Sequence, residues 1–437
     1  MVFSFLQRLY SGMIRPPVVP KSPDNAIRFG ILGASNIAPL AIIGPAKSHP
    51  EVIVHAIAAR SKRRAQEYAQ KHSIAVVHDS YQDVIDDPAI SAIYIGLPNS
   101  LHYEWALKAI LAGKHVLLEK PACSNATEAR ALFQQPIMQT QDAPVLLEAF
   151  HHKFHPAWQT FLSLVHDGAS QIRAVHCQSF MPAGMFAADD IRFMYHLSGG
   201  CMMDFATYCL SCVRDVLRSG SLRVKNVHFR EIDGRGTWQP SEHVRQVDEA
   251  VTAELEADSP DVRISIAADM VKRATFRSSP LSWIGAWPSF GWPKCEVQLA
   301  DRIVEESQST IKEAGTIHTV QQTITLWNLV FLNVWHSITV DHKHAIRQRT
   351  GTQSVVRSWS ERSTIKAYCW PSGHTAEGQE WWSTYRYQLE EFVNKIRGRQ
   401  GSGVWIEGAD SVAQMELIDA IYVKGGLQVR PTSAMLA

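Results

Sequence analysis

The stretch IRFGILGASNIAP, residues 27–39, decides the fold. Its first six residues are mostly apolar and predict a buried strand, and the small residues after them predict a tight turn into a helix. Gly33 opens this turn, and Ser35 and Ala38 stand where a G-x-G-x-x-G motif has its second and third glycines. Small residues and a helix N-terminus suit a pyrophosphate, and an ordinary strand–helix turn is the alternative. The cofactor-binding residues expected here are Gly33, Ser35, Asn36 and Ile37.

Short apolar runs alternate with helical stretches as far as residue 150. The runs are predicted to be strands, and the stretches between them include two clear amphipathic helices. Strand and helix alternating in this order indicate a parallel sheet covered by helices on both faces, as in a doubly wound α/β domain over residues 26–148. The predicted strands are 27–32, 52–59, 89–97, 115–120 and 144–150, and the helices are 61–72 and 100–113.

The pattern changes after residue 150 to longer runs in which apolar and polar residues alternate. Such runs are typical of antiparallel strands with one solvated face. They predict an α+β domain over residues 149–437, built on a large, mostly antiparallel open sheet, whose last helices can pack back on the first domain. The Trp-rich region 275–360 is expected to build part of a substrate pocket or a dimer interface. The clearest strands are 295–306, 316–327 and 363–370, and the helices are 381–398 and 408–426.

Composition favours a two-domain globular protein. The chain has 437 residues, of which 46% are hydrophobic and 19% charged, with a net charge of +1. This balance gives no reason to expect nucleic acid or a membrane surface as a partner. Seven scattered cysteines indicate a reducing compartment, so we expect a cytoplasmic protein. Cys209 and Cys212 form a C-x-x-C spacing inside an apolar helix, which favours packing over a redox pair.

The first 25 residues are basic and end in a proline-rich segment. We interpret them as an N-terminal arm followed by a linker, with a short amphipathic presequence as the alternative.

A basic cluster, AARSKRR, follows the second predicted strand at residues 58–64. An NAD site usually has an acidic residue here to hold the ribose 2′-hydroxyl. Guanidinium groups instead bind a phosphate through paired hydrogen bonds, so the cluster favours NADP. Arg60 and Ser61 are the first candidates, together with Arg64, whereas a solvated helix face accounts for some of the cluster.

The stretch HVLLEKPA, residues 115–122, ends a buried strand with Glu119 and Lys120. In a doubly wound sheet, ligands bind beyond the carboxyl ends of the strands. Lys120 is therefore predicted to point at a nicotinamide and a substrate, with a surface lysine as the alternative. The segments 97–102 and 148–150 end at the same edge.

Three segments together resemble the glucose–fructose oxidoreductase and inositol dehydrogenase family, Gfo/Idh/MocA. They are FGILGASNIA, YIGLPNSLHYEWALKAILAGKHVLLEKP and GGCMMDFATY. Segments 148–158, 189–215 and 385–399 are similar to the branch of dimeric trans-dihydrodiol dehydrogenase and the fungal NADP-dependent D-xylose dehydrogenases. The resemblance spans residues 27–270 and 380–432.

The resemblance implies three catalytic residues, Lys120, Asp204 and Tyr208. The spacing of four places Asp204 and Tyr208 on one helix face. Because a nearby ammonium stabilises tyrosinate, we expect Lys120 to lower the pKa of Tyr208 and Asp204 to orient the pair. A helix cap and a buried aromatic are the alternatives for the latter two residues.

Other residues are predicted to contact the ligands. His102 could instead cap the following helix, and Arg192 could form an interdomain salt bridge. The histidines of HHKFH, at 151, 152 and 155, lack partners for a metal site, and we expect no metal. The cofactor contacts expected are Leu97, Pro98, Asn99, His102, Glu119 and Lys120, and the substrate contacts are Phe154, Arg192 and Phe193.

The resemblance implies an NADP-dependent dehydrogenase that acts on an aldose such as D-xylose or on a cyclic trans-diol, as a homodimer. One alternative is a reductase of a fungal secondary-metabolite intermediate. An NADP-binding regulatory protein without turnover is the alternative from another class.

Overall fold

The computed structural model describes residues 2–167, 171–218, 221–232, 246–259, 261–275, 286–288, 291–304, 316–349 and 354–436. Part of the Trp-rich region, including Trp283, lies outside these ranges.

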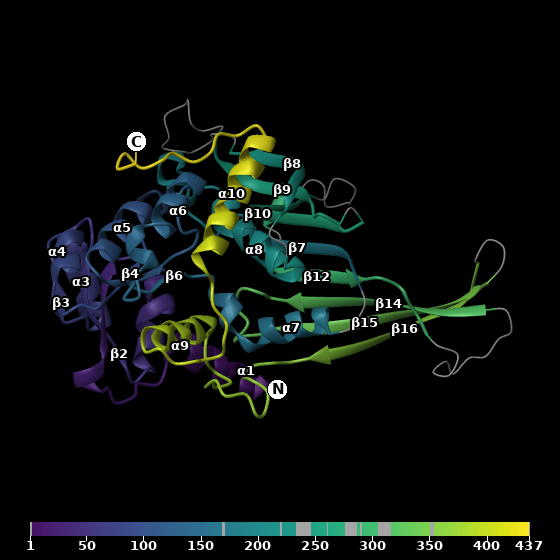
Figure 1. The fold of residues 1–437 in the computed structure, drawn as a ribbon, viewed down its shortest axis with the longest axis horizontal. Coiled ribbons are helices and arrows are strands. Elements are labelled where there is room, and N and C mark those ends of the chain that lie inside the picture. Colours follow the sequence, from purple (N-terminus) through teal and green to yellow (C-terminus); the bar gives the residue numbers. More distant parts are fainter. Residues whose placement is uncertain are drawn as a thin grey trace.

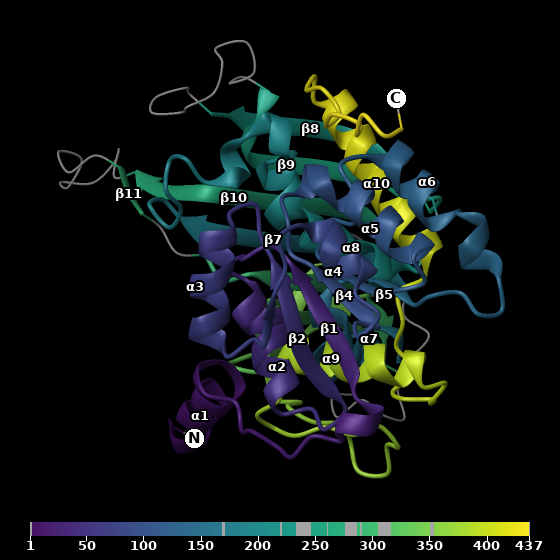
Figure 2. The same cartoon turned by 90° about the vertical axis from the view of Figure 1, so that its left-hand side faces the viewer.

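The N-terminal half is built on a six-stranded parallel sheet in the order β3-β2-β1-β4-β5-β6. Its strands are β1 (Ile27–Leu32), β2 (Val52–Ala58), β3 (Val76–Val77), β4 (Ala92–Ile95), β5 (His115–Leu118) and β6 (Leu146–Glu148). Helices cover the sheet, as Figures 1 and 2 show, and bury strands that are apolar on both faces. The helices are α2 (Gly44–Lys47), α3 (Lys62–His72), α4 (Tyr81–Asp86), α5 (His102–Leu111) and α6 (Ala126–Phe133). The doubly wound fold is confirmed.

The strand order reverses between β1 and β4. Both strands pair with each other, while β2 and β5 lie on their outer sides. A crevice forms at such a switch point beyond the carboxyl ends of the strands, because the connections leave β1 and β4 toward opposite faces. A ligand site is therefore expected at the turns after β1, β4 and β5.

The second half is built on a ten-stranded mixed sheet, mostly antiparallel, with β7 and β10 paired in parallel. Eight strands follow the order β16-β15-β14-β12-β7-β10-β9-β8, with β11 beside β10 and β13 beside β14. The strands are β7 (Ile172–Pro182), β8 (Arg223–Glu231), β9 (Asp248–Glu256), β10 (Arg263–Thr275), β11 (Ala286–Pro288), β12 (Lys294–Leu299), β13 (Arg302–Ile303), β14 (Thr316–Trp327), β15 (Ser337–Gln348) and β16 (Val355–Ile365). In Figure 1, β14, β15 and β16 extend away from the first sheet.

One predicted strand, 363–370, is wrong. β16 ends at Ile365, which pairs with Ile338 near the start of β15, so the partner strand also runs out there. The aromatic residues that follow belong to a loop. The Tyr387 hydroxyl donates to the Tyr368 carbonyl at 3.0 Å, and the Trp370 ring meets that of Tyr387 edge-on. Their apolar character reflects packing against a helix.

Helices connect the two sheets. Among them are α7 (Pro156–His166) and α8 (Thr207–Leu217), which contact β14 and β7, and α9 (Thr384–Ile396) and α10 (Gly408–Lys424). The last two return to the first domain: the Phe392 ring of α9 lies 5.8 Å from that of Phe29 in β1. From α10, Asp419 accepts a hydrogen bond from the Ala126 N–H of α6 at 2.8 Å.

The N-terminal arm begins with a short helix, α1 (Val2–Leu9). Arg8 anchors it, because its guanidinium pairs with Glu380 at 2.7 Å and lies 3.7 Å from the centre of the Tyr368 ring. The arm therefore packs against the segment that precedes α9.

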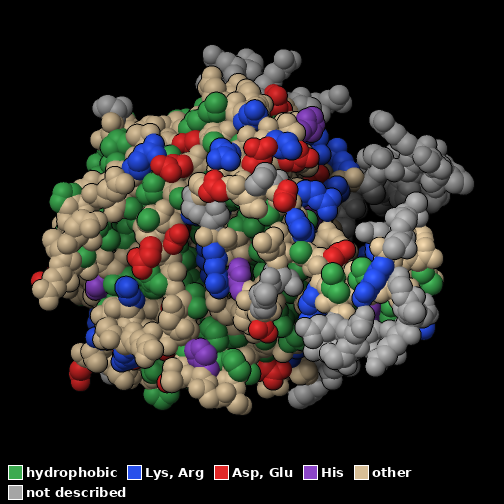
Figure 3. All heavy atoms as spheres, turned by 45° about the vertical axis from the view of Figure 1, so that its right-hand side comes forward, with side chains coloured by type: hydrophobic (Ala, Val, Ile, Leu, Met, Phe, Trp, Pro, Cys, Tyr) green, Lys and Arg blue, Asp and Glu red, His purple; other side chains and the backbone are tan. Residues whose placement is uncertain are grey.

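All seven cysteines are free thiols, six of them buried. Cys209 and Cys212 lie inside α8, fully buried, as the packing interpretation predicted. No helix within the described ranges is long and apolar enough to cross a membrane. On the face shown in Figure 3, lysine and arginine side chains are interspersed with aspartate and glutamate.

The buried histidines predict a loss of stability on mild acidification. Burial lowers the pKa of His102 and His336 to about 4 and that of His151 to about 3, and it lowers the pKa values of His152 and His155 well below the usual range. The unfolded chain binds protons near pH 6.5 where the folded chain does not, so stability falls as the pH drops. Each imidazole contributes up to about 1 kcal/mol between pH 7.5 and 5.5. Circular dichroism should show a steadily falling Tm over this interval, and a constant Tm would contradict the prediction.

Candidate active site

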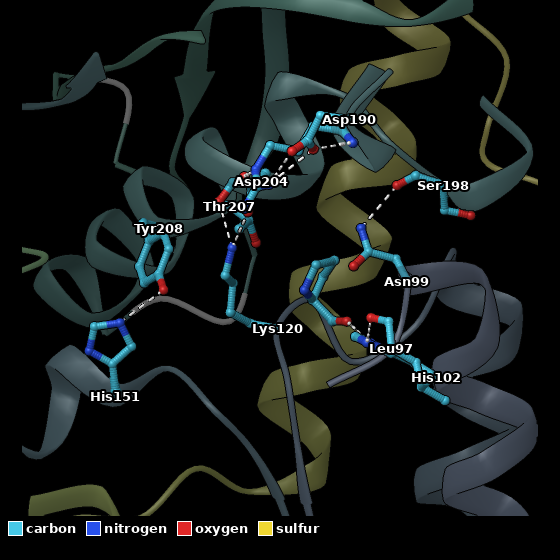
Figure 4. A network of polar contacts seen from close by, with 12 residues as sticks. Leu97, Asn99, His102, Lys120, His151, Asp190, Ser198, Asp204, Thr207 and Tyr208 are labelled. Atoms are coloured by element: carbon cyan, nitrogen blue, oxygen red, sulfur yellow. Dashed lines mark hydrogen bonds and ion pairs between the residues drawn. The ribbon is translucent and has the colours of Figure 1, made fainter. Parts of the chain in front are cut away.

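Lys120 lies just beyond β5 and meets Asp204 of the second domain (Figure 4). Its ammonium donates to Asp204 Oδ1 at 2.5 Å and to the Asp204 carbonyl at 2.9 Å. The pair is shielded, since the two side chains are 10% and 18% exposed. The alternative of a solvated surface lysine is therefore excluded.

Asp204 and Tyr208 belong to one continuous helical segment with two geometries. A π turn, Met202–Ala206, carries Asp204 and leads directly into α8, which carries Tyr208. Single π turns of this kind often occur at functional sites. Figure 4 shows both side chains on the side of the helix that faces Lys120.

Asp204 is held between two cations. Arg192 donates through Nε to Asp204 Oδ2, and its Nη1 contacts Asp190 Oδ1 at 3.0 Å. Burial would raise the pKa of Asp204, but Lys120 and Arg192 outweigh it, so the pKa lies well below its usual value. Asp204 is therefore a carboxylate at every working pH.

Tyr208 differs from the prediction. Burial raises its pKa well above the usual value, and neighbouring acidic groups add to the effect. The Lys120 ammonium lies over the ring face, 4.8 Å from its centre, and is engaged by Asp204. The expectation that Lys120 lowers the pKa of Tyr208 is wrong for this structure, because desolvation dominates and the carboxylate offsets the ammonium.

The group in contact with the Tyr208 hydroxyl is a histidine that the sequence interpretation had considered only for metal binding. His151 Nε2 lies 3.0 Å from Tyr208 Oη, and Nδ1 lies 2.7 Å from Thr384 Oγ1. The ring of Tyr385 lies 3.9 Å from the imidazole, tilted by 31°. Thr384 and Tyr385 begin α9, so no spacing in the sequence indicated this contact.

The turns after β1 and β4 approach each other closely. Gly33 has φ of +97°, and a Cβ there would lie 2.8 Å from Leu97 Cδ2 and 3.1 Å from the Gly96 carbonyl oxygen. A Cβ on Gly96 would lie 2.8 Å from Ser35 Oγ. The Ser35 hydroxyl is itself buried without a hydrogen-bond partner. Small residues thus let the two turns pack together, and the Ser35 hydroxyl beside them is an unused polar group.

Other residues expected at the cofactor follow the same two strands. After β1, Asn36 is exposed and Ile37 half-buried. After β4, Pro98 and Asn99 are half-buried, and the Asn99 amide donates to the Ser198 carbonyl at 3.0 Å (Figure 4). Asn99 thus links the first domain to the loop before Asp204.

Two members of the basic cluster face solvent, as the alternative interpretation anticipated. Arg63 pairs with Glu67 at 2.8 Å along α3, and Lys62 pairs with Asp79. All four side chains are more than half exposed.

The other members lie closer to the crevice. Arg64 donates through Nη2 to the carbonyl of Ala34, at 3.0 Å, in the turn after β1. Ser61 caps α3 by accepting the Arg64 N–H at 3.4 Å. Arg60 is exposed, and its guanidinium has no hydrogen bond or ion pair with the described residues.

His102 and Glu119 are buried and already engaged. The ring nitrogens of His102 lie 2.8 Å from the Pro121 carbonyl and 2.9 Å from the Leu97 carbonyl. These contacts tie two turns together, so neither a direct cofactor contact nor a helix cap describes this side chain. Glu119 accepts the Tyr94 hydroxyl at 2.9 Å, and burial raises its pKa.

The three residues expected to contact the substrate differ in burial and in their partners. Phe154 is fully buried and Phe193 is 8% exposed, so Phe154 is a core residue and not a free contact. Arg192 pairs with Asp204 inside the second domain and so forms no interdomain salt bridge; Lys120 is the residue that reaches Asp204 from the first domain.

The histidines of the HHKFH segment each have another partner. His151 contacts Tyr208, His152 Nε2 lies 3.5 Å from Cys212 Sγ, and His155 caps α7 by accepting the Ala157 N–H at 3.1 Å. Within the described ranges, no group of three or more His, Cys, Asp or Glu side chains has a geometry that could hold a metal ion.

The sequence model of the Gfo/Idh/MocA oxidoreductase family, described as an NAD-binding Rossmann fold, matches residues 27–140. These residues form a Gfo/Idh/MocA domain. The match includes the turn at Gly33, the basic cluster and Lys120, whereas Asp204, Tyr208 and His151 lie beyond it.

Curated relatives extend the similarity past the Gfo/Idh/MocA domain. D-xylose 1-dehydrogenase (NADP(+)) 2 of Haloferax volcanii is 38% identical over 189 residues, 43% of this chain and 56% of that protein. Trans-1,2-dihydrobenzene-1,2-diol dehydrogenase of Danio rerio is 34% identical over 194 residues, 43% of this chain and 55% of that protein. The chain thus spans little more than half the length of these relatives.

The fold resembles that of solved oxidoreductases over most of the chain. A 3-ketoreductase from Actinomadura kijaniata, crystallised with NADP and TDP-benzene, matches with a TM-score of 0.60 and 18% identity. The match covers 92% of this chain and 98% of that chain. At this identity the comparison supports the arrangement of the two sheets.

Proposed function

We propose that this protein is an NADP-dependent dehydrogenase that transfers a hydride between NADP(H) and a hydroxyl of an aldose or a cyclic diol. The observation that carries the proposal is the meeting of Lys120, Asp204 and Tyr208 just beyond the carboxyl edge of the Rossmann sheet. These groups come from two domains, and a structural role alone gives little reason to hold a lysine, a carboxylate and a phenol together there.

The residues of the crevice fit a dinucleotide. Gly33 and Gly96 let the turns after β1 and β4 pack closely together, and the orphaned Ser35 hydroxyl offers a hydrogen bond to a pyrophosphate. Arg60 has a free guanidinium for the 2′-phosphate that distinguishes NADP. When bound, NADP(H) supplies or accepts the hydride.

Lys120 and Tyr208 divide the work on the substrate oxygen. An ammonium has three donors, and Asp204 engages two of them, which leaves one for the substrate oxygen. Its charge stabilises negative charge that develops on that oxygen. Tyr208, protonated because of its raised pKa, donates a proton to a carbonyl in the reducing direction. In the oxidising direction it receives the hydroxyl proton as its own proton passes to a neighbouring acceptor.

The substrate class rests on the relatives that share about half their length with this chain. One is named for D-xylose and another for a cyclic trans-diol. A screen of NADP+ reduction against aldoses and cyclic trans-diols tests this directly. Turnover on at least one compound of these classes is expected. Tight NADPH binding without turnover would instead favour the regulatory alternative, and activity only on specialised ketones would favour the secondary-metabolite reductase.

Arg60→Ala is expected to weaken NADPH binding by about 10- to 100-fold, since one charged hydrogen bond to a phosphate contributes about 1.5–3 kcal/mol. NADH affinity should stay unchanged, because the contact is to the 2′-phosphate alone. Fluorescence titration with both cofactors measures this, with Arg63→Ala as the matched control, because Arg63 pairs with Glu67 on the exposed helix face. Equal NADPH affinity in wild type and Arg60→Ala would remove the assignment.

A homodimer and a cytoplasmic location stay predictions from the sequence. Light scattering on the purified chain and cell fractionation would test them.

A further inference from the structure

The Tyr208 hydroxyl has one side-chain partner among the described residues, and that partner is a neutral imidazole. Burial, with a smaller effect from Lys120, lowers the pKa of His151 to about 3. A neutral imidazole has one N–H and one bare nitrogen, so it can donate at one contact and accept at the other. Both of its nitrogens are in use, at 3.0 Å from Tyr208 and 2.7 Å from Thr384.

The direction of the hydrogen bond between Thr384 and His151 sets the tautomer of the imidazole, that is, which of its two nitrogens carries no hydrogen. When Nδ1–H donates to Thr384 Oγ1, Nε2 accepts the proton of the Tyr208 hydroxyl, and the phenolic oxygen turns its lone pairs toward the substrate. When Thr384 donates to Nδ1, Nε2–H donates to the phenolic oxygen, and the Tyr208 proton is free for the substrate. The same three residues thus prepare Tyr208 as a base or as an acid.

We propose that His151, oriented by Thr384, is the positioning residue that takes and returns the Tyr208 proton during hydride transfer. The inference rests on the proposed function. The arrangement parallels a catalytic triad: Tyr208 is the reacting group, His151 the base in contact with it, and Thr384 the group that orients the base. It also gives the Tyr208 proton an acceptor within hydrogen-bond distance.

The step balances in the oxidising direction. The substrate O–H bond breaks and its proton passes to Tyr208 Oη, while the phenolic proton passes to His151 Nε2. The substrate C–H electron pair leaves with its hydrogen as the hydride. His151 ends as an imidazolium whose two N–H groups donate to Thr384 Oγ1 and Tyr208 Oη. The positive charge that it gains replaces the positive charge that an oxidised nicotinamide ring loses when it accepts a hydride. The low pKa of His151 then favours release of the proton.

The surroundings of His151 supply the other groups that affect its protonation. From the turn after β5 comes Lys120, which disfavours the imidazolium, and from α8 comes Tyr208. α9 provides Thr384 and the ring of Tyr385, whereas two further histidines lie on its own segment, namely His152 and His155.

The test uses two pairs of variants on the full chain. His151→Gln keeps an amide in place of the imidazole but cannot take up a proton, and it is compared with Tyr208→Phe. Thr384→Val removes the orienting hydroxyl at nearly constant shape, and Thr384→Ser restores it. We expect His151→Gln to lower kcat about 100-fold and to flatten its pH profile. Thr384→Val should lower kcat about tenfold, Thr384→Ser should recover most of it, and NADPH affinity should stay constant throughout.

A second readout needs no turnover. Nitrogen-15 NMR of histidine-labelled protein distinguishes the Nδ1–H and Nε2–H tautomers, and the signal absent from His151→Gln identifies this ring. Thr384→Val and Tyr208→Phe should each shift that signal, whereas Thr384→Ser should not. Unchanged nitrogen shifts, or a His151→Gln variant with wild-type kcat and pH profile, would overturn the inference. A wild type with no turnover on any substrate would instead defeat the proposed function, and the nitrogen shifts would still decide whether His151 controls the Tyr208 proton.

Discussion

Tyr208→Phe is expected to lower kcat by about 10²- to 10⁴-fold, the usual contribution of a general acid or base. The substitution removes one hydroxyl and keeps a ring that is 6% exposed and packed at 5.8 Å against Phe150, so the fold should be preserved. NADPH affinity should change little, because in the proposed site the phenol contacts the substrate and not the cofactor. Steady-state kinetics on the substrate found by the screen, with NADPH titration alongside, measures both.

The matched control for this variant is Tyr387→Phe. Tyr387 is also buried, and its hydroxyl donates to the Tyr368 carbonyl at 3.0 Å, but it faces the loop after β16. Its loss should lower Tm slightly and leave kcat unchanged. If both variants lose activity equally, the effect is on folding and the role assigned to Tyr208 fails.

Arg430→Met is expected to destabilise the protein by about 3–5 kcal/mol, because it leaves one partner of a buried ion pair uncompensated. Arg430 Nη2 lies 2.7 Å from Asp248 Oδ1, and both side chains are 0% exposed. Asp248 also accepts the Tyr422 hydroxyl at 3.0 Å and the Met202 N–H at 2.6 Å. Met202 begins the π turn that carries Asp204, so the ion pair supports the candidate site from behind.

Urea denaturation followed by tryptophan fluorescence measures this loss. Arg223→Met is the control, because Arg223 pairs with Asp258 at 3.4 Å on the surface, with side chains 64% and 69% exposed. That change should alter the unfolding free energy by less than about 1 kcal/mol. Replacing Asp248 by asparagine together with Arg430→Met should recover part of the stability. Equal unfolding midpoints for wild type and Arg430→Met would contradict the buried-pair argument.

Local signals predicted much of the candidate site. A lysine at the end of an apolar strand, glycine after the first strand and arginines after the second are each set by a few neighbouring residues. Lys120 and Asp204, 84 residues apart, do meet. This contact could be predicted because ligand sites of doubly wound sheets lie at one edge and because a known family pattern contains both segments. The solvent-exposed positions of Arg63 and Lys62 also follow from nearby residues, because the helix period places both on the face of α3 that is turned to solvent.

The errors have one origin in common. The strand expected at 363–370 and the free substrate contact expected at Phe154 were both judged by residue type, but packing against α9 and the core decided them. The pKa of Tyr208 was judged from a single neighbouring charge, although desolvation depends on every group around the phenol.

By itself, the sequence determined the parallel sheet, the dinucleotide turn and the residue types that carry the chemistry, because strand and helix periods and turn chemistry depend on adjacent residues. Only the tertiary structure decided which proton partner Tyr208 has. His151 reaches it from a short 3-10 helix after β6, and Thr384 and Tyr385 come from α9. Thr384 lies 233 residues further along the chain than His151. Contacts at that separation arise from the packing of distant elements of the second domain against one another, and burial then sets the protonation of each group.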